Sequence, residues 1–351
     1  MSGDQVDVSV RKLQNLTLNE EVEESVFFQT YSRLETHMDL LKDTARTMAY
    51  RDAIEQNRQL FEGKVVLDVG CGMGILSLFA AKAGASKVIG VENADIAALA
   101  SQIVKDNGKE NVVNVVQGLI EEVELPDGIQ QVDIIVSEWM GNALYMEGML
   151  HSVLFARDKW LRPGGLVLPN VANLWIAGAC DPHRSLNNDF WNNVEGFDMS
   201  SVKIQVSHEA VVDCVASQNV LTSAYLVHTT RLESALNTPI KFRSTFELEV
   251  LRTGIIHSMI LYFDVAFLEG QTETPVTLST SPHAPWTHWE QTVLHLDNPL
   301  YVQAKERIIG GFGMFPSSEN SRCMNFELGI RPKGTKGQAS HFKYFNSSQK
   351  L

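Results

Sequence analysis

A glycine-rich turn directly after an apolar run constrains the fold of this chain more than any other feature. The turn spans residues 70–74 (Gly-Cys-Gly-Met-Gly) and follows Val65–Val69, which its apolar residues predict to be a buried strand. Residues 76–82 then have the composition of a helix. A strand, a glycine-rich turn and a helix form a cradle that a nucleotide can approach closely, because glycine has no Cβ. The alternative is a tight turn in an ordinary α/β domain.

The residues around this turn indicate which ligand it would hold. A dinucleotide-binding turn would need a third glycine at position 75, and Ile75 is there. Glu92 ends the next apolar run, and it follows Gly70 at roughly the 20-residue spacing at which a carboxylate reaches ribose hydroxyls. The pattern therefore favours an adenosine-bearing ligand without a pyrophosphate, and S-adenosylmethionine is the leading candidate.

Patterns along the chain predict two domains after a flexible, polar segment, residues 1–26. Over residues 27–169, strand and helix signals alternate, which is typical of a parallel sheet with right-handed crossovers. The last helix of this domain is expected over Leu144–Trp160. Over residues 170–351, runs that alternate apolar and polar residues predict an antiparallel sandwich or barrel. The fold class is therefore α/β plus β.

Residues 181–203 interrupt the alternating pattern of the second domain. They read as a helical insertion that carries Trp191, Phe197 and Met199. Exposed apolar residues that gather in one segment often mark an interface. The alternative is a loop packed on its own barrel.

Composition narrows the class of protein. The chain of 351 residues has a net charge of −13, and an acidic protein is a poor general binder of nucleic acid, because phosphate neutralisation needs clustered Lys and Arg. The same charge suits basic partners better. The four cysteines are scattered, without a Cys-x-x-Cys pair or a zinc set, so we expect free thiols in a reducing compartment and no metal.

No membrane partner is expected. The N-terminus lacks the apolar core of a signal peptide. The apolar stretch over residues 65–85 is interrupted by Asp68, Lys82 and several glycines, which argues against a membrane span.

One glutamate ends the fourth strand predicted in the first domain, Val132–Glu138, and a second lies in the segment after it. Glu138 and Glu147 are placed so that no single helix face aligns them, and only a loop that returns on itself, helped by Gly141, could bring them together. Two carboxylates in one pocket repel each other by about 4 kcal/mol at 4 Å and an effective dielectric of 20. Such a pocket either protonates one of them or binds a cation, and a guanidinium suits two carboxylates best. The alternative is that Glu138 caps a helix and Glu147 is solvated.

With these segments in place, the chain resembles the protein arginine N-methyltransferases from about Phe27 to about Gly334. Five ordered segments carry the resemblance: Phe27-Phe28-Gln29-Thr30-Tyr31; His37 with Leu41-Lys42-Asp43 and Arg46-Thr47; residues 66–74; Ser137-Glu138-Trp139-Met140-Gly141 with Glu147; and Thr287-His288-Trp289.

The resemblance implies a fold, a cofactor and an activity. The fold is a Rossmann-like domain that binds S-adenosylmethionine, then a β-barrel substrate domain whose helical arm at about 181–203 makes a head-to-tail homodimer. The activity is methylation of arginine guanidinium nitrogens in proteins, which gives mono- and asymmetric dimethylarginine, with histones and Gly/Arg-rich proteins as substrates. The expected location is the cytoplasm, with access to the nucleus.

The resemblance also implies residue roles. Glu138 and Glu147 would bind the substrate guanidinium, and His288 would face the active site and complete the catalytic set. Glu92 would bind the ribose hydroxyls and Arg46 the methionine carboxylate. The other cofactor-binding residues would be Phe28, His37, Asp68, Gly70, Gly72, Gly74, Met149 and Glu121, the last in the segment that contacts adenine. The substrate-binding residues would be Tyr31 and Trp289.

Several positions depart from the family pattern. Phe27 lacks the hydroxyl of the usual tyrosine, Asn142 and Met146 stand where tyrosine is frequent, and Leu40 stands where asymmetric-dimethylating members tend to carry methionine. These positions bear on substrate binding and product type. They also keep an alternative open, a weakly active or inactive homologue that acts as a binding or dimerisation partner. A methyltransferase for small molecules or another side chain is a third reading, against which the paired glutamates and Thr-His-Trp argue.

Overall fold

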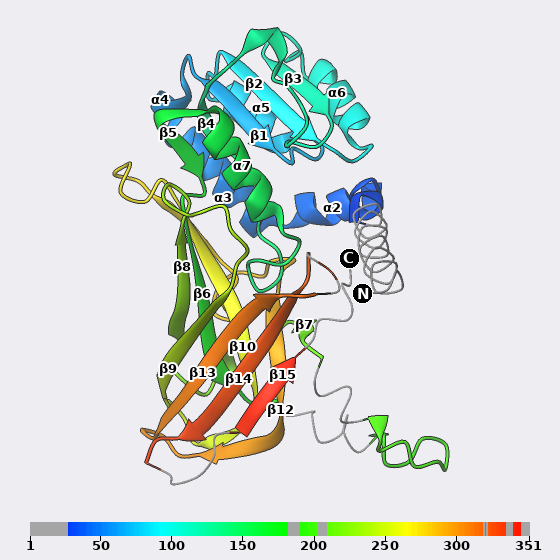
Figure 1. Ribbon diagram of the computed structural model, residues 1–351, viewed down its shortest axis with the longest axis vertical. Helices are drawn as coiled ribbons and strands as arrows, with labels where there is room; N and C mark the ends of the chain where they lie inside the picture. The colour runs from blue at the N-terminus through cyan, green and yellow to red at the C-terminus, as the bar shows by residue number, and fades with distance from the viewer. Residues whose placement is uncertain are drawn as a thin grey trace, which may run out of the picture.

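The computed structural model describes residues 27–181, 190–202, 209–318, 320, 322–334 and the backbone of 340–344. The predicted flexible segment, residues 1–26, lies outside the described residues. The described chain has an α/β domain and a β domain that meet end to end, with the N-terminal helices between them (Figure 1). Among the described residues, no helix is both long and apolar enough to span a bilayer.

The first domain contains a parallel five-stranded sheet in the order β3-β2-β1-β4-β5. Its strands are β1 (Val65–Val69), β2 (Lys87–Glu92), β3 (Val113–Gln117), β4 (Val132–Val136) and β5 (Leu161–Leu168). The helices between them are α5 (Ile75–Lys82), α6 (Ala97–Asp106) and α7 (Met149–Trp160). The strand order reverses between β1 and β4, and ligands of such sheets bind beyond the carboxyl ends of the strands at this point.

The prediction for α7 is wrong at its start. We expected a helix from Leu144, but α7 begins at Met149. The backbone is left-handed at Leu144 (φ 73°), Glu147 (φ 74°) and Gly148 (φ 72°), which a right-handed helix cannot include. Residues 144–148 are therefore part of the loop after β4.

Short helices precede the sheet. Residues 27–31 are helical, followed by α2 (Leu34–Lys42), α3 (Thr44–Glu55) and α4 (Arg58–Phe61). Asp43 is the N-cap of α3. Its Oδ1 accepts the backbone N–H of Arg46 at 2.9 Å and so satisfies a donor in the first turn of the helix.

The second domain consists of two antiparallel sheets. One has the order β7-β12-β10-β6-β8, with β11 paired to β10, and the other has the order β15-β14-β13-β9. The strands are β6 (Val171–Ala179), β7 (Val211–Asp213), β8 (Tyr225–Arg231), β9 (Phe242–Glu249), β10 (Gly254–Phe267), β11 (Val276–Ser279), β12 (Gln291–Val302), β13 (Arg307–Pro316), β14 (Met324–Pro332) and β15 (Ser340–Tyr344). Two 3₁₀ turns lie at Pro126–Gly128 and Ser217–Asn219.

The two domains share one hydrophobic core. Tyr50 of α3 and Phe267 of β10 are fully buried, and their rings pack edge to face at 4.7 Å between centroids. Burying a large apolar side chain contributes about 1.5–3 kcal/mol. This continuous core fixes the loops of the β domain over the carboxyl ends of the parallel strands.

The predicted insertion is described in part. Residues 182–189 and 203 of the range 181–203 lie outside the described residues. Residues 190–202 project away from both sheets of the β domain (Figure 1), and Phe190 and Phe197 are 55% and 69% exposed. The described part of the insertion therefore presents aromatic side chains to solvent in the single chain.

Candidate functional site

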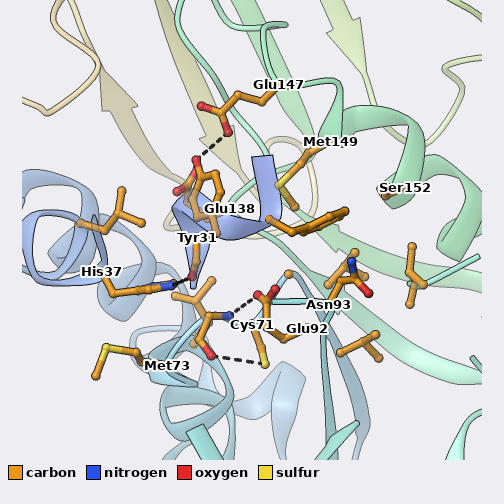
Figure 2. Close-up of a pocket in the computed structure, with 18 of the residues that line it drawn as sticks. Tyr31, His37, Cys71, Met73, Glu92, Asn93, Glu138, Glu147, Met149 and Ser152 are labelled. Carbon is orange, nitrogen blue, oxygen red and sulfur yellow. Dashed lines mark hydrogen bonds between the residues drawn. The ribbon is translucent and has the colours of Figure 1, made fainter. Parts of the chain in front are cut away.

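A cavity of about 310 Å³ lies beyond the carboxyl ends of β1, β2 and β4 (Figure 2). Side chains and backbone from both domains line it. Of the residues predicted from the sequence, it is lined by Phe28, Tyr31, His37, Arg46, Gly70, Gly72, Glu92, Glu121, Glu138, Glu147, Met149 and His288. Asp68, Gly74 and Trp289 do not line it.

The glycine turn forms the floor of the cavity. Gly70 and Gly72 have φ of +71° and +53°, a conformation that favours glycine. A Cβ on Gly70 would lie 2.6 Å from the Cε of Met149, and one on Gly72 would lie 3.0 Å from the Cε1 of His37. Gly74 precedes α5 with φ +84° and so allows the helix to begin. The turn is therefore a cradle that side chains would fill.

A carboxylate stands at the end of β2 beside this turn. Glu92 accepts the backbone N–H of Gly72 at 2.9 Å through Oε2, and that of Ala94 at 2.8 Å through Oε1. Burial raises the pKa of Glu92, and these two backbone hydrogen bonds oppose the shift. A carboxylate oxygen has two acceptor positions, so Glu92 can accept further hydrogen bonds on its cavity side.

Asp68 of β1 lies two residues before the glycine turn. It is fully buried, and its Oδ2 accepts the hydroxyl of Ser77 at 2.6 Å. Burial raises the pKa of Asp68 to about 7, although the hydrogen bonds from Ser77 lower it. The Asp68 side chain therefore links β1 to α5 and does not line the cavity.

Glu138 lies in the cavity on a well-anchored backbone. The hydroxyl of Ser137 donates to the carbonyl of Val69 at 2.7 Å, and the hydroxyl of Tyr50 donates to the carbonyl of Ser137 at 2.8 Å. Arg46 Nε donates to Glu138 Oε2 at 3.0 Å, and both side chains are close to fully buried. The second oxygen, Oε1, is buried and accepts no hydrogen bond from any described residue.

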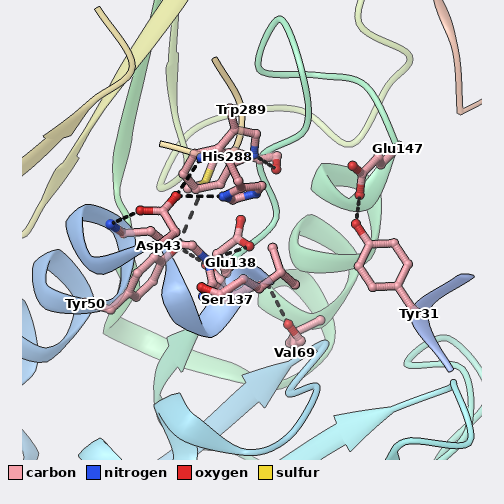
Figure 3. A network of polar contacts seen from close by, with 12 residues as sticks. Tyr31, Asp43, Tyr50, Val69, Ser137, Glu138, Glu147, His288 and Trp289 are labelled. Atoms are coloured by element: carbon pink, nitrogen blue, oxygen red, sulfur yellow. Dashed lines mark hydrogen bonds and ion pairs between the residues drawn. The ribbon is translucent and has the colours of Figure 1, made fainter. Parts of the chain in front are cut away.

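Glu147 lies in the same cavity as Glu138. It is 2.7 Å from the hydroxyl of Tyr31, which donates to Oε2 (Figures 2 and 3). Burial raises the pKa of Glu147 to about 7, and the charge of Glu138 adds to that increase, while the Tyr31 hydrogen bond and the charge of Arg322 lower it. A carboxylate with this pKa binds a cation readily, because the cation restores its charged form.

The loop between the two glutamates turns back on itself. Gly141 and Leu144 exchange backbone hydrogen bonds at 3.1 and 2.9 Å. A Cβ on Gly141 would lie 2.3 Å from the carbonyl oxygen of Met146, which is too close for any side chain. The predicted need for glycine at this position is confirmed. Neither glutamate caps a helix or points to solvent, so that alternative is excluded.

The β domain contributes His288 to the cavity. Asp43, fully buried, accepts both the backbone N–H of His288 at 2.9 Å and its Nδ1 at 2.8 Å (Figure 3). Burial alone would raise the pKa of Asp43, but the hydrogen bonds from His288 and from the backbone of Arg46 outweigh it and hold the pKa below its usual value. Asp43 therefore fixes the orientation of the His288 ring.

Trp289 stands behind the cavity. It is 3% exposed, its indole N–H donates to the carbonyl of Met140 at 2.8 Å, and the amide of Asn142 donates to the carbonyl of Trp289 at 2.9 Å. The sequence placed Trp289 among substrate-binding residues, whereas the structure makes it a buried link between two loops. Asn142, a departure from the family pattern, completes that link.

Comparison with known proteins decides the family. Residues 170–335 match the model of the arginine methyltransferase oligomerization subdomain, and residues 46–154 match that of ribosomal protein L11 methyltransferase. The chain is 43% identical over 303 residues to protein arginine N-methyltransferase 1 of Dictyostelium discoideum, covering 86% of this chain and 88% of that relative. The chain belongs to the protein arginine N-methyltransferases.

Solved structures agree with this membership. A Trypanosoma brucei PRMT1 enzyme–prozyme heterotetrameric complex with AdoHcy has a TM-score of 0.84 and 39% identity, covering 90% of this chain and 99% of that one. Arabidopsis thaliana protein arginine methyltransferase 10 has a TM-score of 0.81 and 32% identity, covering 91% and 99%. The protein is an S-adenosylmethionine-dependent protein-arginine N-methyltransferase, and its matched subdomain supports oligomerisation.

The residues of the cavity fit this cofactor. The glycine cradle admits a ligand where side chains would collide, and Glu92 offers acceptors beside it. In the described part of the chain, no group of three His, Cys, Asp or Glu side chains could hold a metal ion.

Sequence reasoning missed two residues of this arginine methyltransferase site. Asp43 belongs to one of the segments that carry the resemblance, and its position before α3 is typical of a helix cap. Its hydrogen bond to the His288 side chain joins two distant segments, and no sequence pattern indicates it. Arg322 follows β13 and lines the cavity, but no motif surrounds it.

Proposed function

We propose that this enzyme forms monomethylarginine and asymmetric dimethylarginine in Gly/Arg-rich proteins and histones. The observation that carries the proposal is the buried Oε1 of Glu138, an acceptor without a donor among the described residues, in one cavity with Glu147. A planar guanidinium offers donors to both carboxylates at once. The net charge of −13 suits basic substrates.

The roles that we propose for the cofactor-binding residues are those that the family resemblance implies, and the residues named here line the cavity. Glu92 binds the ribose hydroxyls, Glu121 lies by the adenine, and Arg46 binds the methionine carboxylate while it donates to Glu138. Phe28, His37 and Met149 line the cavity around the cofactor, and Tyr31 helps to bind the substrate. When bound, S-adenosylmethionine supplies a methyl group on a sulfonium sulfur.

The two glutamates prepare the guanidinium for reaction. Free guanidinium is a poor nucleophile because its lone pairs are delocalised. Hydrogen bonds to Glu138 and Glu147 draw positive charge toward the bound nitrogens and leave electron density on the attacking one. Fixed orientation of this kind is worth roughly 7–11 kcal/mol, and preorganised charge adds to it. We propose that Glu147, with a pKa raised to about 7, accepts the proton that the methylated nitrogen loses.

The rate should depend on the charge of Glu147. Its pKa in the free enzyme is raised from 4.5 to about 7, so protonation removes the guanidinium site as the pH falls through that value. We expect kcat/KM for an arginine peptide to rise with pH through about 7, because kcat/KM reports groups of the free enzyme. The acid limb of the kcat profile should lie at lower pH than that of kcat/KM, because the bound guanidinium of the substrate favours the charged form of Glu147. A kcat/KM that is flat across this range would contradict the assignment.

The product proposal is tested by label analysis. The purified protein is incubated with methyl-labelled S-adenosylmethionine and a Gly/Arg-rich peptide, and the hydrolysed peptide is examined for its labelled amino acid. We expect monomethylarginine first and asymmetric dimethylarginine later. Monomethylarginine alone would direct attention to Leu40, which lines the cavity, and to Asn142 and Met146 as the residues that limit the product. Donor binding without any transfer would favour the non-catalytic partner.

We also propose an assembly and a location. Residues 190–202 carry the exposed Phe190 and Phe197, which suits a homodimer formed through the 181–203 arm, and sedimentation of the purified chain tests it. A cytoplasmic location with access to the nucleus is proposed from the family resemblance and is tested by cell fractionation.

A further inference from the structure

Arg322 is a cavity residue to which the proposed chemistry gives no role. It lies in the connection between β13 and β14, at the end of the β domain that faces the parallel sheet, and it lines the same cavity as Tyr31 and Glu147. The segment therefore reaches the site from a part of the chain far from every motif.

Arg322 holds the backbone of Glu147. Its guanidinium NH1 donates to the carbonyl oxygen of Glu147 at 2.7 Å, and the backbone N–H of Glu147 donates to the carbonyl of Arg322 at 2.7 Å. Glu147 has a φ of 74°, which costs a non-glycine residue on the order of 1–3 kcal/mol and persists only where neighbours enforce it. The reciprocal pair of hydrogen bonds is such an enforcement.

Arg322 also holds the helix at residues 27–31. The central carbon of its guanidinium lies 4.1 Å from the ring centroid of Phe27 and 5.3 Å from that of Phe28. Cations over aromatic faces at these distances attract the rings. Tyr31 of the same helix donates to the Glu147 carboxylate. The Arg322 guanidinium therefore contacts both the aromatic helix and the backbone of Glu147. The same helix binds the side chain of Glu147 through Tyr31.

The charge of Arg322 acts on Glu147 as well. The charged and titratable groups that face Glu147 are Tyr31 from the first helix, Glu138 from the loop after β4 and Arg322. Arg46 of α3 is paired with Glu138, and His288 shares the cavity. Burial and Glu138 raise the pKa of Glu147, and Arg322 is the cation that opposes them.

We propose that Arg322 is a positioning residue that couples the aromatic helix at residues 27–31 to Glu147. Arg322 holds in place both the helix at residues 27–31, which lines the cofactor cavity, and Glu147, which belongs to the guanidinium site. Without it, the helix and the left-handed backbone at Glu147 lose their common support. The inference rests on the proposed guanidinium-binding role of Glu147.

Two variants test the coupling. Arg322→Gln removes the charge and the ring contacts, and Arg322→Lys keeps the charge but loses the planar group that stacks. In Arg322→Gln, we expect kcat/KM for the peptide to fall at least about tenfold near neutral pH, with its acid limb moved to higher pH. In Arg322→Lys, we expect the limb to stay near its wild-type position and the rate to fall at every pH.

Matched variants separate coupling from general damage. Arg243 stacks on Phe315 at 4.5 Å and pairs with Glu327 on an exposed face, so Arg243→Gln removes similar contacts among residues that do not line the cavity. It should leave the rate and the limb unchanged. If the limb of Arg322→Gln does not move and its rate matches that of Arg243→Gln, the coupling role is overturned. Wild-type activity in Glu147→Gln would instead overturn the guanidinium role on which the inference rests.

Discussion

Replacing Glu147 with glutamine is expected to abolish methyl transfer and to leave the binding of S-adenosylmethionine nearly unchanged. Glutamine keeps the shape of the side chain, and its carbonyl oxygen can still accept the hydroxyl of Tyr31. It loses the negative charge that polarises the guanidinium, and removal of one preorganised electrostatic group typically costs about 10²–10³ in kcat. Transfer of labelled methyl groups measures the loss, and calorimetric titration with the cofactor measures binding.

The control for this variant is a glutamate outside the site. Glu327 of β14 pairs with Arg243 on an exposed face, so Glu327→Gln should keep the full rate. Retained turnover in Glu147→Gln would count against the two-carboxylate site. A parallel loss of cofactor binding would mean that Glu147 shapes the donor cavity and not the substrate site alone.

Replacing Gly141 with alanine should be nearly as damaging. The new Cβ would lie 2.3 Å from the carbonyl oxygen of Met146, so the loop between the glutamates must shift. A displacement of about 1 Å at a catalytic group can cost 10²-fold in rate, and we expect a loss of that order together with a lowered melting temperature.

A glycine in a strand provides the comparison for Gly141. In Gly311→Ala, the nearest atom to the new Cβ is the carbonyl oxygen of Ser244 at 3.9 Å, which is ordinary contact. This variant should keep its rate and its melting temperature within experimental error. Equal effects of the two substitutions on the rate would show that the tight loop has no special part in catalysis.

Local patterns were enough to predict much of the fold. The bounds of β1 and the end of β2 coincide with the prediction, because both strands are short buried runs that end at recognisable residues, a glycine turn and Glu92. The parallel sheet was predicted because strand and helix signals alternate along residues 27–169. The start of α7 was missed, because the left-handed backbone at Leu144 and Glu147 is imposed by the surrounding loop and not by the residue types.

The site was less accessible to sequence reasoning where contacts join distant segments. Glu138 and Glu147 follow one strand, so the shared cavity could be anticipated from topology. The contact of Asp43 with His288 and that of Arg322 with Glu147 cross between domains, and no spacing records them. Trp289 was expected near the substrate because it belongs to the Thr-His-Trp segment, but it packs against the His288 ring at 4.0 Å between centroids and its indole N–H is taken up by the carbonyl of Met140, a contact between distant loops that the motif does not record.

The central claim is that Glu138 and Glu147 together recognise a guanidinium group. It is tested most directly by offering the enzyme labelled S-adenosylmethionine with a Gly/Arg-rich peptide and, separately, with the same peptide in which every arginine is lysine. Lysine carries the same charge but lacks the planar set of donors. We predict labelled methylarginine from the first peptide and no label in the second. Comparable labelling of the lysine peptide would contradict the account.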